Sequence, residues 1–194
     1  TNGKGLLKNK CLDEIKRLDC GRWFGSEFKN IKIPTLEEIL QKFKNIAHFQ
    51  IELKDNNNLL PEIVLDYLQK NDWYKSNFKD PYQVPGFSIT SFHIKQILRT
   101  KKIDNKVIVG WLLEVNKKIN KELFEYCKTE DINMIIPQVN SISEEDISLI
   151  DEIKKSRITL CAWGARNLEE VKKMSILGID AMTVDWPDKA LKVI

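Results

Sequence analysis

Short apolar runs alternate with amphipathic stretches along the chain from Phe49 onward. The runs are rich in β-branched and aromatic residues, as strands are. The stretches between them repeat apolar residues every three or four positions, which is typical of helices that bury one face. Six strands are predicted, over Phe49–Leu53, Phe87–Ser91, Val107–Leu112, Ile132–Ile136, Ile158–Trp163 and Ala181–Val184. Five helices are predicted between them, over Leu60–Gln69, His93–Arg99, Lys118–Lys128, Glu144–Lys154 and Leu168–Leu177.

Residues that cap helices support these boundaries. A Ser, Thr or Asn followed three residues later by an acid can satisfy free backbone N–H groups at a helix start. A glycine just after the last apolar position is typical of a helix end. The start signals are Thr35 with Glu38, Ser143 with Asp146, and Asn167 with Glu170, and the end signal is Gly178.

Repeated strand-then-helix units predict an α/β fold with a parallel sheet and helical crossovers. The predicted strands are apolar on both faces, as strands covered by helices are. Such a sheet forms either an open doubly wound layer or a (β/α)8 barrel of the TIM type. No Gly-x-Gly-x-x-Gly loop follows any strand, which favours the barrel. A complete barrel has eight strands in about 250 residues, two strands more than are predicted here.

The first 45 residues do not follow the alternation. They contain an amphipathic stretch over Leu12–Leu18, an aromatic loop over Gly21–Phe28, and a loop that enters a helix after Pro34. Nothing in this segment indicates a second domain. Trp23, Phe24 and Phe28 are interpreted either as a hydrophobic mouth for a substrate or as a surface that packs on the barrel.

Composition limits the classes of partner. The chain has 194 residues, 42% of them hydrophobic, and a net charge of +3 with acids and bases interspersed. A nucleic-acid-binding surface normally needs concentrated basic residues, so no nucleic-acid partner is expected. No apolar run approaches the roughly 20 residues of a membrane-spanning helix. The start at Thr1 is neither an initiator methionine nor a signal peptide, which predicts a processed product or a fragment.

Cysteine usage indicates free thiols. The four cysteines, Cys11, Cys20, Cys127 and Cys161, are widely spaced and form no Cys-x-x-Cys pair. This spacing predicts neither a zinc site nor a disulfide framework. Reduced thiols favour a cytoplasmic setting.

An acid and a base end the first predicted strand. Because strand side chains alternate between faces, Gln50, Glu52 and Lys54 point to one side of the sheet. A carboxylate and an ammonium side by side can hold a metal ion and an anion together. An acid and a base at this spacing can equally form a surface ion pair on an edge strand. The pattern therefore leaves open whether the two residues form a binding site or a surface ion pair.

The two histidines are not predicted to be catalytic. His48 shares a face with Glu52 but lies about 13 Å away, toward the other end of the strand. His93 opens a helix.

Further candidates have two interpretations each. Trp111 suits either the pocket or the barrel core, and Arg166 either contacts a phosphodiester or is a solvated loop residue. Cys161 shares a face with Trp163 and is expected beneath the site as an inert thiol. Asp185 and Asp188 flank Pro187 and suit either a second carboxylate site or a turn, which favours such residues.

Several segments, in order along nearly the whole chain, resemble the glycerophosphodiester phosphodiesterase family. The order of the matches, rather than any single one, makes the resemblance specific. The matching segments are Leu12–Phe24, Ile33–Leu40, Ile51-Glu52-Leu53-Lys54, Thr90-Ser91-Phe92, the strand ending in Trp163, and Gly178–Pro187.

The resemblance implies a (β/α)8 barrel that hydrolyses glycerophosphodiesters to glycerol 3-phosphate and an alcohol, with a divalent metal ion, Mg²⁺ or Ca²⁺, as cofactor. By the same resemblance, Glu52 is a metal ligand, Lys54 contacts the phosphate, and Phe92 and Trp163 line the substrate pocket. The chemistry is consistent, because hard cations prefer carboxylate oxygens and a lysine stabilises charge that develops on phosphate.

The departures from the family pattern are concentrated at the start. The family's His-Arg, Glu-x-Asp and His-Asp motifs of the first two strands are missing, and Gly164-Ala165-Arg166 replaces Thr-Val-Asn. The resemblance therefore implies one partial domain over 1–194, with the family insertion and a connecting helix over 1–45 and barrel strands three to eight over 46–194. No catalytic histidine is predicted in this chain, which is expected to be inactive by itself. A non-catalytic barrel with a binding role and a phospholipase-D-like lyase are the alternatives.

Overall fold

The computed structural model of the chain describes residues 1–57, 59–73 and 81–194. These residues divide into two compact units, Thr1–Ala47 and His48–Ile194, which are described separately. The predicted assignment of residues 1–45 to a family insertion stays a prediction.

The first unit consists of short helices held by polar side chains. Its elements are η1 (Leu7–Asn9), α1 (Leu12–Arg17), η2 (Ser26–Phe28) and α2 (Leu36–Phe43). The Asp19 carboxylate accepts hydrogen bonds from the backbone N–H groups of Asn30, Gly21 and Arg22 at 2.8–3.0 Å. These N–H groups, that of Asn30 most, hold the pKa of the Asp19 carboxyl below its usual range. A charged acceptor thus orders the aromatic loop around it.

The aromatic residues of this loop contact one another edge to face. The Phe24 ring centroid lies 5.8 Å from that of Trp23 and 5.1 Å from that of Phe28. Trp23 and Phe24 are largely exposed. The two interpretations of this cluster, a substrate mouth or a packing surface, both stay predictions.

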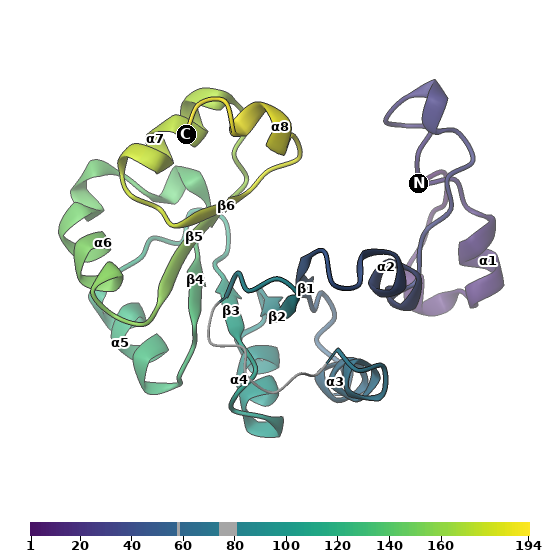
Figure 1. Cartoon of the computed structure of the whole chain (residues 1–194), viewed down its shortest axis with the longest axis horizontal. Helices are drawn as coiled ribbons and strands as arrows, with labels where there is room; N and C mark the ends of the chain where they lie inside the picture. Colours follow the sequence, from purple (N-terminus) through teal and green to yellow (C-terminus); the bar gives the residue numbers. More distant parts are fainter. Residues whose placement is uncertain (58, 74–80) are drawn as a thin grey trace. The chain divides into compact units, whose positions relative to one another are not determined.

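The second unit is built on six parallel strands (Figure 1). The strands pair in chain order, so each strand–helix unit lies beside the next, as in a (β/α) barrel. Within the described residues the sheet runs from an edge at β1 to an edge at β6. The strands are β1 (His48–Glu52), β2 (Gly86–Ser91), β3 (Val109–Leu112), β4 (Met134–Ile136), β5 (Thr159–Trp163) and β6 (Ala181–Thr183).

Helices connect these strands and cover the outer face of the sheet. Helix α4 packs on β2 and β3, and α6 packs on β5. Figure 1 shows α5 and α6 beside one another on the outer side of β4 and β5. The helices are α3 (Leu60–Lys70), α4 (Ile94–Ile103), α5 (Lys121–Thr129), α6 (Ile147–Lys154), α7 (Leu168–Ile176) and α8 (Pro187–Ala190), with short helical turns η3 (Val139–Ser141) and η4 (Glu144–Asp146).

The inner face of the sheet is filled by alternate strand residues. Gly110 belongs to this face, where a Cβ would approach the ends of Ile136 and Met134 to 2.8 and 2.9 Å. Glycine therefore lets these two larger side chains fill the interior. The buried members of the inner cluster are Ile108, Leu112, Met134, Ile136 and Cys161, and Phe92, Trp163 and Ala181 pack against them.

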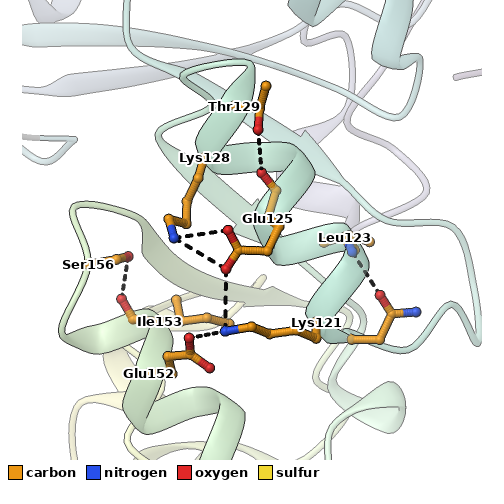
Figure 2. A network of polar contacts seen from close by, with 9 residues as sticks. Lys121, Leu123, Glu125, Lys128, Thr129, Glu152, Ile153 and Ser156 are labelled. Carbon is orange, nitrogen blue, oxygen red and sulfur yellow. Dashed lines mark hydrogen bonds and ion pairs between the residues drawn. The ribbon is translucent and has the colours of Figure 1, made fainter.

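A network of charges joins α5 to α6 on the outer surface (Figure 2). Lys121 forms ion pairs with Glu125 at 3.3 Å and with Glu152 of α6, and Lys128 contacts Glu125 at 3.0 Å. Lys128 first, and Lys121 second, lower the pKa of the Glu125 carboxyl. Because these side chains are exposed, the network adds little to the stability of the fold.

The predicted elements are confirmed, with small shifts at their ends. Thr35 and Glu38 form a reciprocal capping box, and Ser143 and Asp146 form another. Asn167 caps α7 as predicted, but Glu170 binds the backbone N–H of Arg166 instead of completing a box. Helix α8 lies where a turn was predicted.

Candidate active site

A cavity opens at the carboxyl ends of the strands, where active sites of (β/α) barrels lie. Its volume is about 420 Å³. The four residues predicted for the site, Glu52, Lys54, Phe92 and Trp163, all line it. The remaining lining residues are Gln50, Thr90, Leu112, Gly164, Ala165, Thr183, Val184 and Asp185.

Glu52 and Lys54 form the charged side of the cavity at the end of β1. The Lys54 Nζ donates to both Glu52 carboxylate oxygens at 2.8 Å. The Glu52 side chain is 29% exposed and the Lys54 side chain 78% exposed. The two residues are therefore an ion pair that also lines the cavity, and their binding of a metal ion and an anion stays a prediction.

Phe92 and Trp163 form an apolar wall. Their rings meet edge to face, with centroids 5.3 Å apart and planes at 88°. The Trp163 Nε1–H donates to the backbone carbonyl of Leu113 at 3.2 Å. This hydrogen bond, together with the neighbouring ring, holds the indole in one orientation.

The end of β6 forms the part of the rim beside Trp163. Thr183 is the register partner of Trp163, and the chain continues through Val184 to Asp185 along the cavity. Gly164 follows Trp163 with a φ of 80°, a conformation that glycine adopts without strain.

Cys161 is buried in the inner cluster below Trp163. The Tyr82 hydroxyl lies 3.0 Å from its Sγ. Burial raises the pKa of the Cys161 thiol to about 11. The predicted buried thiol is therefore confirmed, and Cys161 is not poised as a nucleophile.

Neither histidine lines the cavity. The His48 ring contacts the carbonyl of Gln83 at 2.9 Å and the hydroxyl of Ser88 at 3.1 Å, at the amino-terminal end of β1. His93 is the N-cap residue of α4. That neither residue is the catalytic base stays a prediction.

Two further candidates lie outside the cavity. The Arg166 guanidinium is held by Glu170 at 2.8 Å and Asn140 at 3.3 Å. Trp111 is on the outer face, where it packs against Tyr126 at 6.0 Å and lies 4.3 Å below the Lys117 ammonium. The proposed places for Trp111, in the pocket or the barrel core, are therefore both wrong. Its position on β3 alternates with inward-facing Leu112, which was the signal available in the sequence.

The donor groups present do not by themselves fit a divalent metal. Mg²⁺ and Ca²⁺ take six or more oxygen ligands. In the described part of the chain, no three His, Cys, Asp or Glu side chains gather in a group that could hold a metal ion. Glu52 is moreover already paired with Lys54.

Sequence comparisons connect the chain to one family. The model of the Glycerophosphoryl diester phosphodiesterase family matches residues 1–189. The protein YhdW of Bacillus subtilis is 26% identical over 202 residues, which cover 99% of this chain and 74% of that protein. A glycerophosphodiester phosphodiesterase of Caldanaerobacter subterraneus is 26% identical over 195 residues, covering 100% of this chain and 75% of that protein.

Solved structures share the fold. A phosphodiesterase of Oleispira antarctica, in complex with its product sn-glycerol 3-phosphate, matches 99% of this chain and 73% of its own chain, with a TM-score of 0.78 at 20% identity. A glycerophosphodiester phosphodiesterase of Agrobacterium tumefaciens matches with a TM-score of 0.74 at 19% identity, over 99% of this chain and 75% of its own. No helix among residues 1–57, 59–73 and 81–194 has the length and apolarity needed to cross a membrane.

Proposed function

Because the chain belongs to the glycerophosphoryl diester phosphodiesterase family, we propose that it carries the substrate pocket of an enzyme that hydrolyses glycerophosphodiesters to glycerol 3-phosphate and an alcohol. The observation that carries the proposal is the meeting of Glu52, Lys54, Phe92 and Trp163 around one cavity, although they lie at or just after the ends of three different strands, β1, β2 and β5. In the reaction, water adds to phosphorus, the bond from phosphorus to the alcohol oxygen breaks, and the alcohol leaves with a proton.

Lys54 would hold the phosphate. Its ammonium is the cation among the described lining residues, and its side chain is largely exposed to a ligand that enters the cavity. Negative charge grows on the phosphoryl oxygens as water adds, so a nearby ammonium stabilises the transition state more than the substrate.

Glu52 is proposed as one ligand of a divalent metal, Mg²⁺ or Ca²⁺. A carboxylate is the ligand type these ions prefer, and Glu52 faces the cavity. The described donors do not complete a metal site, so further ligands would have to join Glu52 around the ion.

The 194-residue chain by itself is proposed to be inactive. No histidine among the described residues lines the cavity, and no metal-ligand group is complete there. Substantial metal-dependent release of glycerol 3-phosphate by this purified chain would contradict the proposal.

The function is tested by Glu52→Gln in the protein as it is produced from its gene. We expect the release of glycerol 3-phosphate from glycerophosphodiesters to fall by about 100-fold or more, the scale of losing a charged catalytic group. The melting temperature should change little, because the side chain is partly exposed at the cavity. Glu114→Gln, at an exposed residue outside the cavity, is the matched control and should keep full activity.

A non-catalytic binding barrel is the second candidate. It is favoured because the described residues place no histidine at the cavity and form no complete group of metal ligands. If the protein produced from its gene binds a glycerophosphodiester but neither binds a divalent metal nor releases glycerol 3-phosphate, this candidate replaces the enzyme.

A further inference from the structure

We propose that the aromatic loop of the first unit, residues 21–28, docks on the surface of an anionic lipid bilayer. Three properties of the first unit point to this partner: a backbone that is ordered around the loop, aromatic rings that are exposed on it, and a surplus of positive charge. Such docking does not depend on the reaction proposed for the cavity of the second unit.

The backbone of the aromatic loop is held at its base and from within. The Cys20 N–H donates to the carbonyl of Ile31 at 2.8 Å, so the chain that enters the loop lies beside the chain that leaves it. The Asp19 carboxylate accepts hydrogen bonds from three backbone N–H groups of the same segment. A loop that is already ordered presents its side chains to a partner without a large entropic cost on binding.

The loop exposes two adjacent aromatic rings. The exposed fraction is 76% for Trp23 and 69% for Phe24. The Trp23 Nε1–H donates to the carbonyl of Cys20 at 2.8 Å, so the polar atom of the indole is satisfied inside the segment. The side chain therefore presents mostly apolar ring to its surroundings. Adjacent exposed apolar residues mark an interaction surface more than single ones do, and tryptophan is enriched where proteins meet the membrane interface.

Positive charge is concentrated in the first unit. Residues 1–47 contain ten lysines and arginines and six acids, which gives a net charge of +4. Residues 48–194 contain the other 21 lysines and arginines and 22 acids, which gives −1. Exposed Arg22 lies in the aromatic loop and exposed Lys29 directly after it, against one acid, Glu27. Anionic headgroups attract basic residues that lie beside an apolar anchor.

An anionic bilayer matches both the rings and the bases. Stable binding at a membrane surface combines buried apolar area with attraction to charged headgroups, and the first unit offers both. A second copy of the chain is a poorer partner for the same loop. A symmetric contact through it would bring together two units that each carry a net charge of +4.

The test is cosedimentation of the 194-residue chain with lipid vesicles. The charged vesicles contain phosphatidylglycerol and phosphatidylcholine in equal parts, and the neutral vesicles contain phosphatidylcholine alone. We expect at least about tenfold tighter binding to the charged vesicles. The binding should weaken as the salt concentration is raised, because salt screens the attraction between exposed charges.

Two pairs of variants assign the binding to the loop. Trp23→Gln should weaken binding to the charged vesicles by about fivefold or more. Ile176→Gln is its control, because Ile176 of α7 is also 76% exposed but lies in the second unit, and it should bind as the unchanged protein does. Lys29→Gln should weaken binding by about threefold or more, whereas Lys118→Gln, the same loss of charge in the second unit, should have less effect.

Trp23→Phe separates insertion of the ring from an effect on folding. This variant keeps an aromatic anchor and should still bind. When the phosphatidylcholine of the charged vesicles carries bromine on its acyl chains, contact with the bromine quenches tryptophan fluorescence. The unchanged protein should then lose fluorescence, and Trp23→Phe should lose clearly less, although four other tryptophans remain.

Absence of binding to the charged vesicles, or equal binding to charged and neutral ones, would overturn the inference. Unchanged binding by Trp23→Gln, or equal quenching in Trp23→Phe, would overturn it too. If vesicle binding is absent and Trp23→Gln lowers the sedimentation coefficient of the protein alone, a second copy is the partner of the loop. None of these outcomes alters the proposed function, which Glu52→Gln tests at the cavity.

Discussion

Gly164 shows how a single backbone conformation shapes the site. It follows Trp163 at the end of β5 with a φ of 80°, and it lines the cavity together with Ala165. In this conformation a side chain crowds its own backbone, although a Cβ would make only ordinary contact with Gln138 Cγ, at 3.4 Å. The turn after β5, through which the chain lines the cavity, therefore depends on glycine at position 164.

We predict that Gly164→Ala destabilises the protein by about 1–2 kcal/mol, the cost of placing alanine in the left-handed region. Gly164→Asn should cost less, because asparagine tolerates this region better than other non-glycine residues. Urea unfolding of the three proteins checks the order. Equal stability of the alanine variant and the unchanged protein would contradict the prediction.

The alternation of side chains along a strand explains why some residues that line the cavity could be predicted from the sequence. It correctly placed Glu52 and Lys54 on one side of β1, and both line the cavity. It also placed Gln50 on that side, and applied to β2 it would have added Thr90 to the lining residues. Asp185 was missed because it lies beyond the last strand, where alternation no longer applies and a proline turn explains an aspartate equally well.

At the scale of elements, a charged contact joins α3 to α4. The Arg99 Nε donates to a Glu62 carboxylate oxygen at 2.6 Å, between neighbouring helices. This hydrogen bond lowers the pKa of the Glu62 carboxyl from its usual 4.5. A carboxyl with a lowered pKa in the folded state stabilises the fold above its unfolded pKa, and this stabilisation is lost as pH falls through the folded value.

We therefore predict that Glu62→Gln removes part of the loss of folding stability that the protein shows at acid pH. The variant should be less stable than the unchanged protein at pH 7, and the difference should shrink as the pH falls below about 4.5, the ordinary pKa of the group. Urea midpoints measured between pH 7 and 3 provide the test. Glu145→Gln, at an exposed glutamate, is the control; a difference that stays constant with pH would refute the role of Glu62.

Hydrophobic periodicity predicted all six strands and the five helices between them, because each element buries a continuous apolar face. The ends of the elements were less well predicted. Helix α4, predicted to end at Arg99, continues to Ile103, because its last turn contains two lysines that interrupt the apolar pattern. Helix α8 was missed because its four residues are too few for any periodicity to appear.

At the scale of the whole molecule, the sheet of the second unit has two edges in the described residues. Strand β1 pairs with β2 and strand β6 with β5, each along one side. Free strand edges present unpaired backbone groups that favour association with another chain. The sequence alone predicted the barrel class but not whether the edge strands pair with another chain. Such pairing uses backbone N–H and C=O groups, and the pattern of apolar side chains carries no information about them.

We predict that the purified 194-residue chain associates as its concentration rises. Sedimentation velocity from low to high micromolar concentration should show the sedimentation coefficient increasing. Introducing a lysine at the β6 edge, in Met182→Lys, should reduce this association, because charged residues discourage edge pairing. A single monomeric species at every concentration would contradict the prediction.

The measurement that tests the central claim most directly is calorimetric titration of sn-glycerol 3-phosphate into the unchanged protein, Lys54→Met and Lys118→Met. Lys118 is exposed and lies outside the cavity, so its variant matches the lost charge without touching the site. We predict similar binding by the unchanged protein and Lys118→Met, and binding weaker by about tenfold or more in Lys54→Met, which loses the ammonium and leaves Glu52 to repel the phosphate. Binding that is unaffected by Lys54→Met would show that the cavity at the carboxyl ends of the strands is not the phosphate site.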